Sequence, residues 1–170
     1  MKLTTFISMV TVALAPVVAH ADSNDEKFPA NQLTLDGFGT YHQTFPTFGS
    51  QFDRNWKHGN FGGGVGLNYF FVPYLGLGVD TYSEDHGAFF KNVAGSLILR
   101  MPVAQSGFAP YIFGGVGGTF DPVNEWTEHA GLGVEYRFSR HIGLFGDWRY
   151  TFEEKEPNSN LVRVGVRFGL

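Results

Sequence analysis

The sequence predicts an all-β protein, an eight-stranded antiparallel up-and-down transmembrane β-barrel. Three observations predict this fold. Apolar residues recur at every second position along most of the chain, which is the period of a strand with two different faces. In the clearest segments nearly all charged side chains keep to the opposite phase. Most segments have at least the roughly 9–11 residues that a tilted strand needs to cross a bilayer.

The chain begins with the features of an export signal. Lys2 precedes an apolar stretch from Phe6 to Val18, and small residues follow at Ala19 and Ala21. This pattern predicts signal-peptide cleavage after Ala21. A membrane anchor is the alternative, but the stretch is too short to cross the hydrocarbon core. The expected organisation is a cleaved signal peptide at 1–21, a short polar periplasmic segment at 22–32 and the barrel at 33–170.

The alternation is clearest in three segments, at 128–138, 142–152 and 161–170. In the last of them, valine and phenylalanine alternate with arginine and glycine up to the end of the chain. The charges that share the phase opposite to the apolar residues are Glu135, Arg137, Asp147, Arg149, Arg163 and Arg167. Glu128, at the edge of its segment, is in the apolar phase. Three consecutive segments of this kind predict strands with one apolar face.

Five earlier segments complete the barrel. They lie at 33–45, 61–72, 75–83, 88–101 and 111–120, and the last is too rich in glycine for its phase to be assigned. The connections at 72–74, 102–110 and 139–141 fall on one side of the predicted sheet. The even strand count places both chain ends on that side, as in barrels with short periplasmic turns and longer outward loops.

Aromatic residues gather near both ends of the predicted strands, as in the belts at membrane interfaces. Ordinary strand packing is the alternative interpretation. The predicted periplasmic belt is Tyr69, Phe71, Tyr74, Phe108, Tyr111, Tyr136, Phe138 and Phe168, and the predicted outer belt is Tyr82, Phe89, Phe120, Trp126, Trp148, Tyr150 and Phe152.

A water-soluble β-barrel or sandwich is the competing fold. It would carry a surface dense in charge, whereas charged residues are only 16% of this chain and the polar phase is mostly glycine with a few Arg and Asp. That mixture suits the narrow interior of an eight-stranded barrel. The absence of cysteine excludes disulfide scaffolds, thiol catalysis and cysteine-ligated metals. The net charge of −4 argues against nucleic acid as a partner.

Several segments carry a family resemblance. The run 108–111 with the glycines after it, the run 131–138 and the run 147–150 resemble the OmpA-like, OmpX and opacity-protein group of small outer-membrane barrels. The resemblance covers about residues 31–170 and implies the cell outer membrane as the location. The chain end is similar to the signal read by the barrel assembly machinery, with Leu170 where the family usually has Phe. The residues of this predicted assembly signal are Val162, Val164, Val166, Phe168 and Leu170.

Charged residues of the inward phase are the main candidate site. They are Asp36, Asp80, Arg100, Glu135, Arg137, Asp147, Arg149, Arg163 and Arg167. One hypothesis is a selective or gated pore for small solutes. The other is a buried ion-pair network that fills the barrel, and the small interior of eight strands favours it.

Catalytic signals are weak. Barrels of this kind can be lipid A acylases or deacylases, and the one compact candidate here is the run from Ser83 to His86. A nucleophile, a base and an orienting acid must lie within mutual hydrogen-bond reach, which four consecutive residues do not provide. We therefore expect no catalytic site and, because the histidines are scattered, no metal or other cofactor.

The predicted outward loops are polar and acidic, and aromatic residues stand among their charges. Phe48, Phe52, Trp56 and Trp126 are candidates for contact with a surface partner. The expected function is a non-catalytic structural or cell-surface interaction role, with a lipid A-modifying enzyme and a small-solute channel as alternatives. The expected partners are outer-membrane lipid and lipopolysaccharide, with periplasmic chaperones and the assembly machinery during biogenesis. We expect a monomer.

Overall fold

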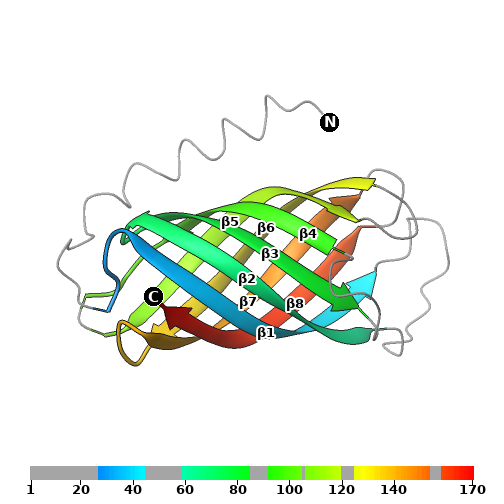
Figure 1. The fold of residues 1–170 in the computed structure, drawn as a ribbon. Helices are drawn as coiled ribbons and strands as arrows, with labels where there is room; N and C mark the ends of the chain where they lie inside the picture. The colour runs from blue at the N-terminus through cyan, green and yellow to red at the C-terminus, as the bar shows by residue number, and fades with distance from the viewer. Residues whose placement is uncertain (1–26, 45–58, 85–91, 105, 120–124, 154–157) are drawn as a thin grey trace.

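The computed structural model describes residues 27–44, 59–84, 92–104, 106–119, 125–153 and 158–170. They form one closed barrel of eight strands (Figure 1). The strands are β1 (Gln32–Thr44), β2 (Asn60–Val72), β3 (Leu75–Glu84), β4 (Asn92–Arg100), β5 (Phe108–Thr119), β6 (Glu125–Arg137), β7 (Ile142–Glu153) and β8 (Ser159–Gly169). Each strand is antiparallel to the next, and β1 pairs with β8 to close the barrel. The predicted fold class is confirmed. Among the described residues there is no helix that is long and apolar enough to span a membrane.

The two faces of the barrel wall differ in chemistry. On β6, Leu132 points outward and is 57% exposed, whereas Glu135, one phase over, is fully buried in the lumen. On β8, Val164 is 66% exposed and Arg163 only 8%. Successive side chains of a strand point to opposite faces, so the alternation in the sequence becomes an apolar outer face and a charged interior. A barrel of this kind needs an apolar medium around it.

Three short connections lie at one end of the barrel, together with the start of β1 and the end of β8 (Figure 1). We call this end the turn end. The opposite end is called the loop end. At the turn end, Gly107 has a φ of 78°, and a Cβ there would lie 2.4 Å from the carbonyl oxygen of Arg137. Only glycine adopts this conformation in such close contact with a neighbouring chain segment. The Gly107 carbonyl in turn accepts a hydrogen bond from the Arg137 amide at 2.7 Å.

Two strands begin well before their predicted start, and several other boundaries differ from the prediction by one or two residues. β5 begins at Phe108 and β6 at Glu125, each three residues before the predicted start. Pro110 lies within β5, although the sequence analysis placed it in the connection. In antiparallel strands the N–H and C=O of one residue point to the same neighbour. The Pro110 carbonyl accepts from Met101, beyond the last β4–β5 ladder pair, so the missing N–H of proline costs no ladder bond. The predicted strand residues 45, 88–91 and 120 lie outside the described residues.

The structure also assigns the phase of β5. Tyr111 and Phe113 point into the barrel, whereas Ile112 and Val116 are exposed on its outside. The prediction that Tyr111 and Tyr82 belong to the aromatic belts is therefore wrong. They are 3% and 8% exposed and lie in the interior of the barrel. Both share the inward phase of their strands, and this phase overrides the position of a ring near a strand end.

Most of the other described belt residues lie on the outer surface. Tyr69 packs on Phe71 with ring centroids 5.1 Å apart at the turn end, and Tyr136 packs on Phe138 at 5.2 Å. Trp148, Tyr150 and Phe152 form a ladder of rings on β7 toward the loop end. Phe89 and Phe120 lie outside the described residues. Glu128 is exposed on the outer face of β6.

Candidate functional site: the charged barrel interior

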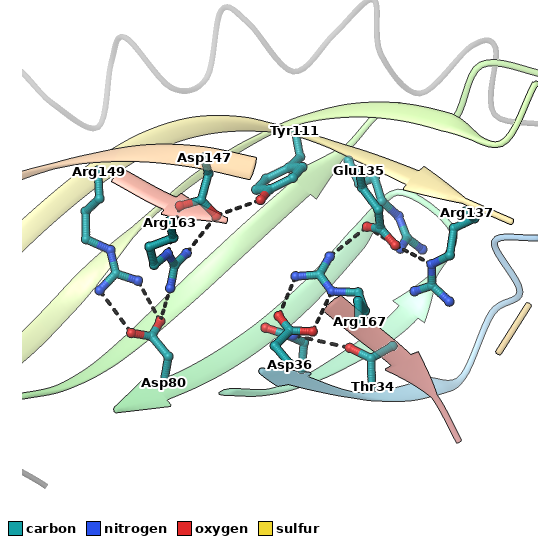
Figure 2. A network of polar contacts seen from close by, with 12 residues as sticks. Thr34, Asp36, Asp80, Tyr111, Glu135, Arg137, Asp147, Arg149, Arg163 and Arg167 are labelled. Carbon is teal, nitrogen blue, oxygen red and sulfur yellow. Dashed lines mark hydrogen bonds and ion pairs between the residues drawn. The ribbon is translucent and has the colours of Figure 1, made fainter. Parts of the chain in front are cut away.

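All nine charged residues of the inward phase point into the lumen, and none is more than 8% exposed. Their contacts divide them into two clusters (Figure 2). The turn-end cluster is Asp36, Arg100, Glu135, Arg137 and Arg167. The central cluster is Asp80, Asp147, Arg149 and Arg163. The sequence predicted which charges share the lumen, and the structure adds which of them meet.

Glu135 is the centre of the turn-end cluster. Its carboxylate is fully buried and receives guanidinium groups from three strands: Arg100 at 3.3 Å, Arg167 at 2.6 Å, and Arg137, which donates through Nε. Arg167 also forms a two-pronged contact with Asp36, at 2.7 and 2.6 Å. Charge-assisted forks of this kind are the strongest side-chain hydrogen bonds. The cluster thereby connects β1, β4, β6 and β8 through the lumen.

The central cluster crosses the barrel. Arg149 on β7 donates to both oxygens of Asp80 on β3, at 3.0 and 2.5 Å (Figure 2). Arg163 bridges Asp80, at 3.0 Å, and Asp147, at 2.7 Å. The Tyr111 hydroxyl donates to Asp147 at 2.6 Å. β3 and β7 are opposite strands in the closed order, so these bonds tie opposite walls together.

Aromatic rings fill the space around the guanidinium groups. The Cζ of Arg100 lies 3.7 Å from the ring centre of Phe70, that of Arg167 lies 4.9 Å from Phe145, and that of Arg163 lies 5.1 Å from Phe38. A ring face attracts a cation, and the attraction is larger where water is excluded. The sequence analysis did not single out these phenylalanines. Phe38 and Phe145 lie in the same phase as the charges of their strands, and Phe70 lies in the same phase as the polar Asn68 on β2, which has no charged residue.

Little free volume remains between the two clusters. A void of about 10 Å³ lies among Asp36, Asp80, Tyr111, Arg163 and Arg167. That is at the lower limit of the room one water molecule needs. In the part of the barrel that the structure describes, the interior charges are therefore paired with one another instead of facing a wide aqueous path.

Candidates for catalysis are dispersed. Ser96 Oγ lies 2.8 Å from His129 Nε2, but both side chains are buried in the lumen, away from the lipid-facing surface. In the run from Ser83 to His86, Ser83 is buried, and Asp85 and His86 lie outside the described residues. Within the described ranges, no three His, Asp or Glu side chains are grouped so that they could hold a metal ion.

Of the predicted surface-contact residues, Trp126 is 80% exposed near the loop end. Phe48, Phe52 and Trp56 lie outside the described residues. Most of the predicted assembly-signal residues are well exposed on the outer face of β8 and its end: Val162 (41%), Val164 (66%), Phe168 (43%) and Leu170 (72%), with Val166 partly exposed.

An apolar outer face around a closed ring of strands, with paired charges inside, defines a membrane-spanning β-barrel protein. The chain belongs to the family described as outer membrane protein beta-barrel domain, whose model matches residues 7–168. Membership of this family places the protein in the outer membrane.

Three solved structures show the same fold. The N-terminal β-barrel domain of Pseudomonas aeruginosa OprF is 14% identical, with a TM-score of 0.63 over 83% of this chain and 98% of that chain. Neisserial surface protein A is 16% identical, with a TM-score of 0.58 over 81% and 95%. A de novo designed transmembrane β-barrel is 18% identical, with a TM-score of 0.57 over 83% and 97%. No curated protein matches the sequence. Since a designed barrel shares the architecture, the fold does not define a function.

Proposed function

We propose that the protein is a non-catalytic outer-membrane barrel with a structural or surface-interaction role at its loop end. The observation that carries this proposal is the pairing of the buried interior charges into two clusters that link opposite and neighbouring walls. Buried ion pairs that join different strands hold the barrel wall in one arrangement, whereas an open aqueous pore needs solvated walls. In this proposal the barrel is a monomeric support surrounded by lipid and lipopolysaccharide, and the exported chain reaches the membrane with periplasmic chaperones and the assembly machinery.

Planar-bilayer recording distinguishes the proposed structural barrel from the small-solute channel. We expect no discrete conductance steps from the folded protein, because Arg149 and Arg163 span the lumen and are held by Asp80 and Asp147. The gel mobility of the reconstituted sample, run without boiling, verifies that the protein is folded when no conductance is observed. Reproducible steps that disappear after heat denaturation of the sample would favour the small-solute channel.

The lipid A profile tests the enzyme alternative. We expect overexpression to leave the mass profile of lipid A unchanged relative to the empty vector, because the Ser96–His129 pair is buried inside the lumen, where acyl chains do not reach. A gained or lost acyl chain would contradict the proposal. The Ser96→Ala variant is the matched control, since it would abolish such a change only if this pair were responsible.

A further inference from the structure

The turn-end cluster contains more positive than negative charge. Its three arginines face two carboxylates, Asp36 and Glu135, and none of the five residues is more than 5% exposed. The central cluster, by contrast, pairs two arginines with two aspartates. An uncompensated charge away from water is unfavourable. The turn end of the lumen therefore has an electrostatic need for one more anion.

Two of the three arginines also have an unpaired donor. Arg100 uses Nε on the Pro73 carbonyl, at 2.9 Å, and Nη1 on Glu135, and its buried Nη2 has no hydrogen-bond partner. Arg137 uses Nε on Glu135 and Nη1 on the Arg140 carbonyl, at 3.0 Å, and its Nη2 is also unpaired and buried. Arg167, in contrast, uses all three nitrogens. Buried donors without partners are rare because they lose their bonds to water.

The side chain of Phe28 covers these two arginines. It is fully buried, and its ring centre lies 4.7 Å from the Cζ of Arg100 and 5.7 Å from that of Arg137. The ring contributes apolar burial and a favourable interaction with the cations. It offers no oxygen acceptor, so it leaves both donors unpaired. While Phe28 is docked, Arg100 and Arg137 therefore cannot complete their hydrogen bonds.

The segment that carries Phe28 is joined to β1 and β2 through Asn31. Before β1, Asn31 is a non-glycine residue in the left-handed region, with a φ of 53°. Its amide donates to the Phe71 carbonyl at 3.3 Å, and its side chain accepts from the Tyr69 hydroxyl at 3.3 Å. These bonds are longer than is usual for such donors. The left-handed turn leads from β1 to residues 27–30, which lie at the turn end of the barrel. There the side chain of Phe28 is buried against Arg100 and Arg137.

We propose that Phe28 is a removable stopper over an oxyanion-binding vestibule formed by Arg100 and Arg137. When the stopper leaves, a small oxyanion, a phosphate or a carboxylate, accepts the two unpaired N–H groups and neutralises the excess charge. Planar guanidinium groups suit such oxygens. The vestibule opens at the turn end, which faces the periplasm in outer-membrane barrels. Anion binding and docking of Phe28 exclude each other.

Inorganic phosphate is the probe in the first test. The Phe28→Ala variant, folded in detergent, is heated in increasing phosphate and in sodium chloride of matched ionic strength. We expect a saturable rise of the unfolding midpoint in phosphate alone, with an apparent affinity about tenfold higher than in the unsubstituted protein. The reason is that the unsubstituted site is competent only in the fraction of molecules whose stopper has left.

Two further variants locate the effect. Phe28→Ala combined with Arg137→Gln is expected to lose the phosphate response, and Phe28→Ala combined with Arg149→Gln, which alters the central cluster only, is expected to keep it. An equal shift in phosphate and chloride would overturn the proposal, and so would a phosphate response that survives Arg137→Gln.

A second measurement does not depend on the folding of the alanine variant. The chain has no cysteine, so Ala30→Cys provides a unique position for a spin label on the exposed part of the stopper segment. We expect phosphate, but not chloride, to increase the mobility of the label. A label whose spectrum is unchanged at saturating phosphate would show that the stopper does not leave, and the proposal would fail.

Discussion

Replacing Glu135 with glutamine is expected to lower the free energy of unfolding by about 3–5 kcal/mol, the cost of breaking a buried ion pair by removal of one partner. The carboxylate is fully buried and is contacted by Arg100, Arg137 and Arg167. Glutamine keeps nearly the same volume but removes the negative charge, so three cations remain with Asp36 alone. Urea unfolding in lipid vesicles, followed by tryptophan emission and gel mobility, measures the change.

Glu128→Gln is the matched control for this substitution. Glu128 lies on the same strand, but its side chain is exposed on the outer face near the loop end. The same chemical change should there alter stability by no more than about 0.5 kcal/mol, as is usual for surface positions. Equal effects of the two substitutions would mean that the charges inside the barrel are solvated, and the proposal of a filled lumen would be wrong.

Leu132→Arg is expected to cost about 2–4 kcal/mol, the penalty for an arginine on the lipid face near the middle of the bilayer. Leu132 is 57% exposed and lies close to the centre of β6. In a water-soluble protein the same change at so exposed a position would have little effect. The measurement therefore tests directly which face of the wall contacts lipid.

Trp126→Arg is the control for depth on the same strand and the same face. Trp126 is 80% exposed and is the second residue of β6, at the loop end. Arginine at an interface costs only about 0–1 kcal/mol. The expected result is a large difference between the two arginine variants when both are folded in vesicles. Similar losses at both positions would contradict a depth-dependent membrane environment.

The sequence alone predicted the features that follow from local geometry. Each strand repeats with a period of two, so the apolar phase of β8 and the charged phase of β6 were assigned without knowledge of the neighbours. The sequence also indicated which face is the outer one. The polar phase is mostly glycine with a few arginines, whereas the outer face of a soluble barrel would need many charged residues. Even the list of nine lumen charges required only the phase of each segment.

Partner choice within the lumen was decided by the tertiary structure. Asp80 and Arg149 are 69 positions apart and meet because closure places β3 opposite β7 and the stagger of the strands brings them to one height. The alternation within one strand does not reveal this stagger, because the stagger depends on the register of all eight strand pairings together. The same reason explains why Glu135 collects three arginines whereas Asp36 receives one.

Phe28 is the residue that the sequence analysis missed most completely. The segment 22–32 was expected to be a short polar stretch outside the barrel, and no period links Phe28 to the lumen. Its burial depends on the left-handed turn at Asn31 and on two guanidinium groups that β4 and β6 bring to the turn end. The sequence by itself therefore determined the wall of the barrel and the face on which each side chain stands. What fills and closes its interior was decided only by the tertiary structure, because those contacts join residues whose heights are set by closure of the whole sheet.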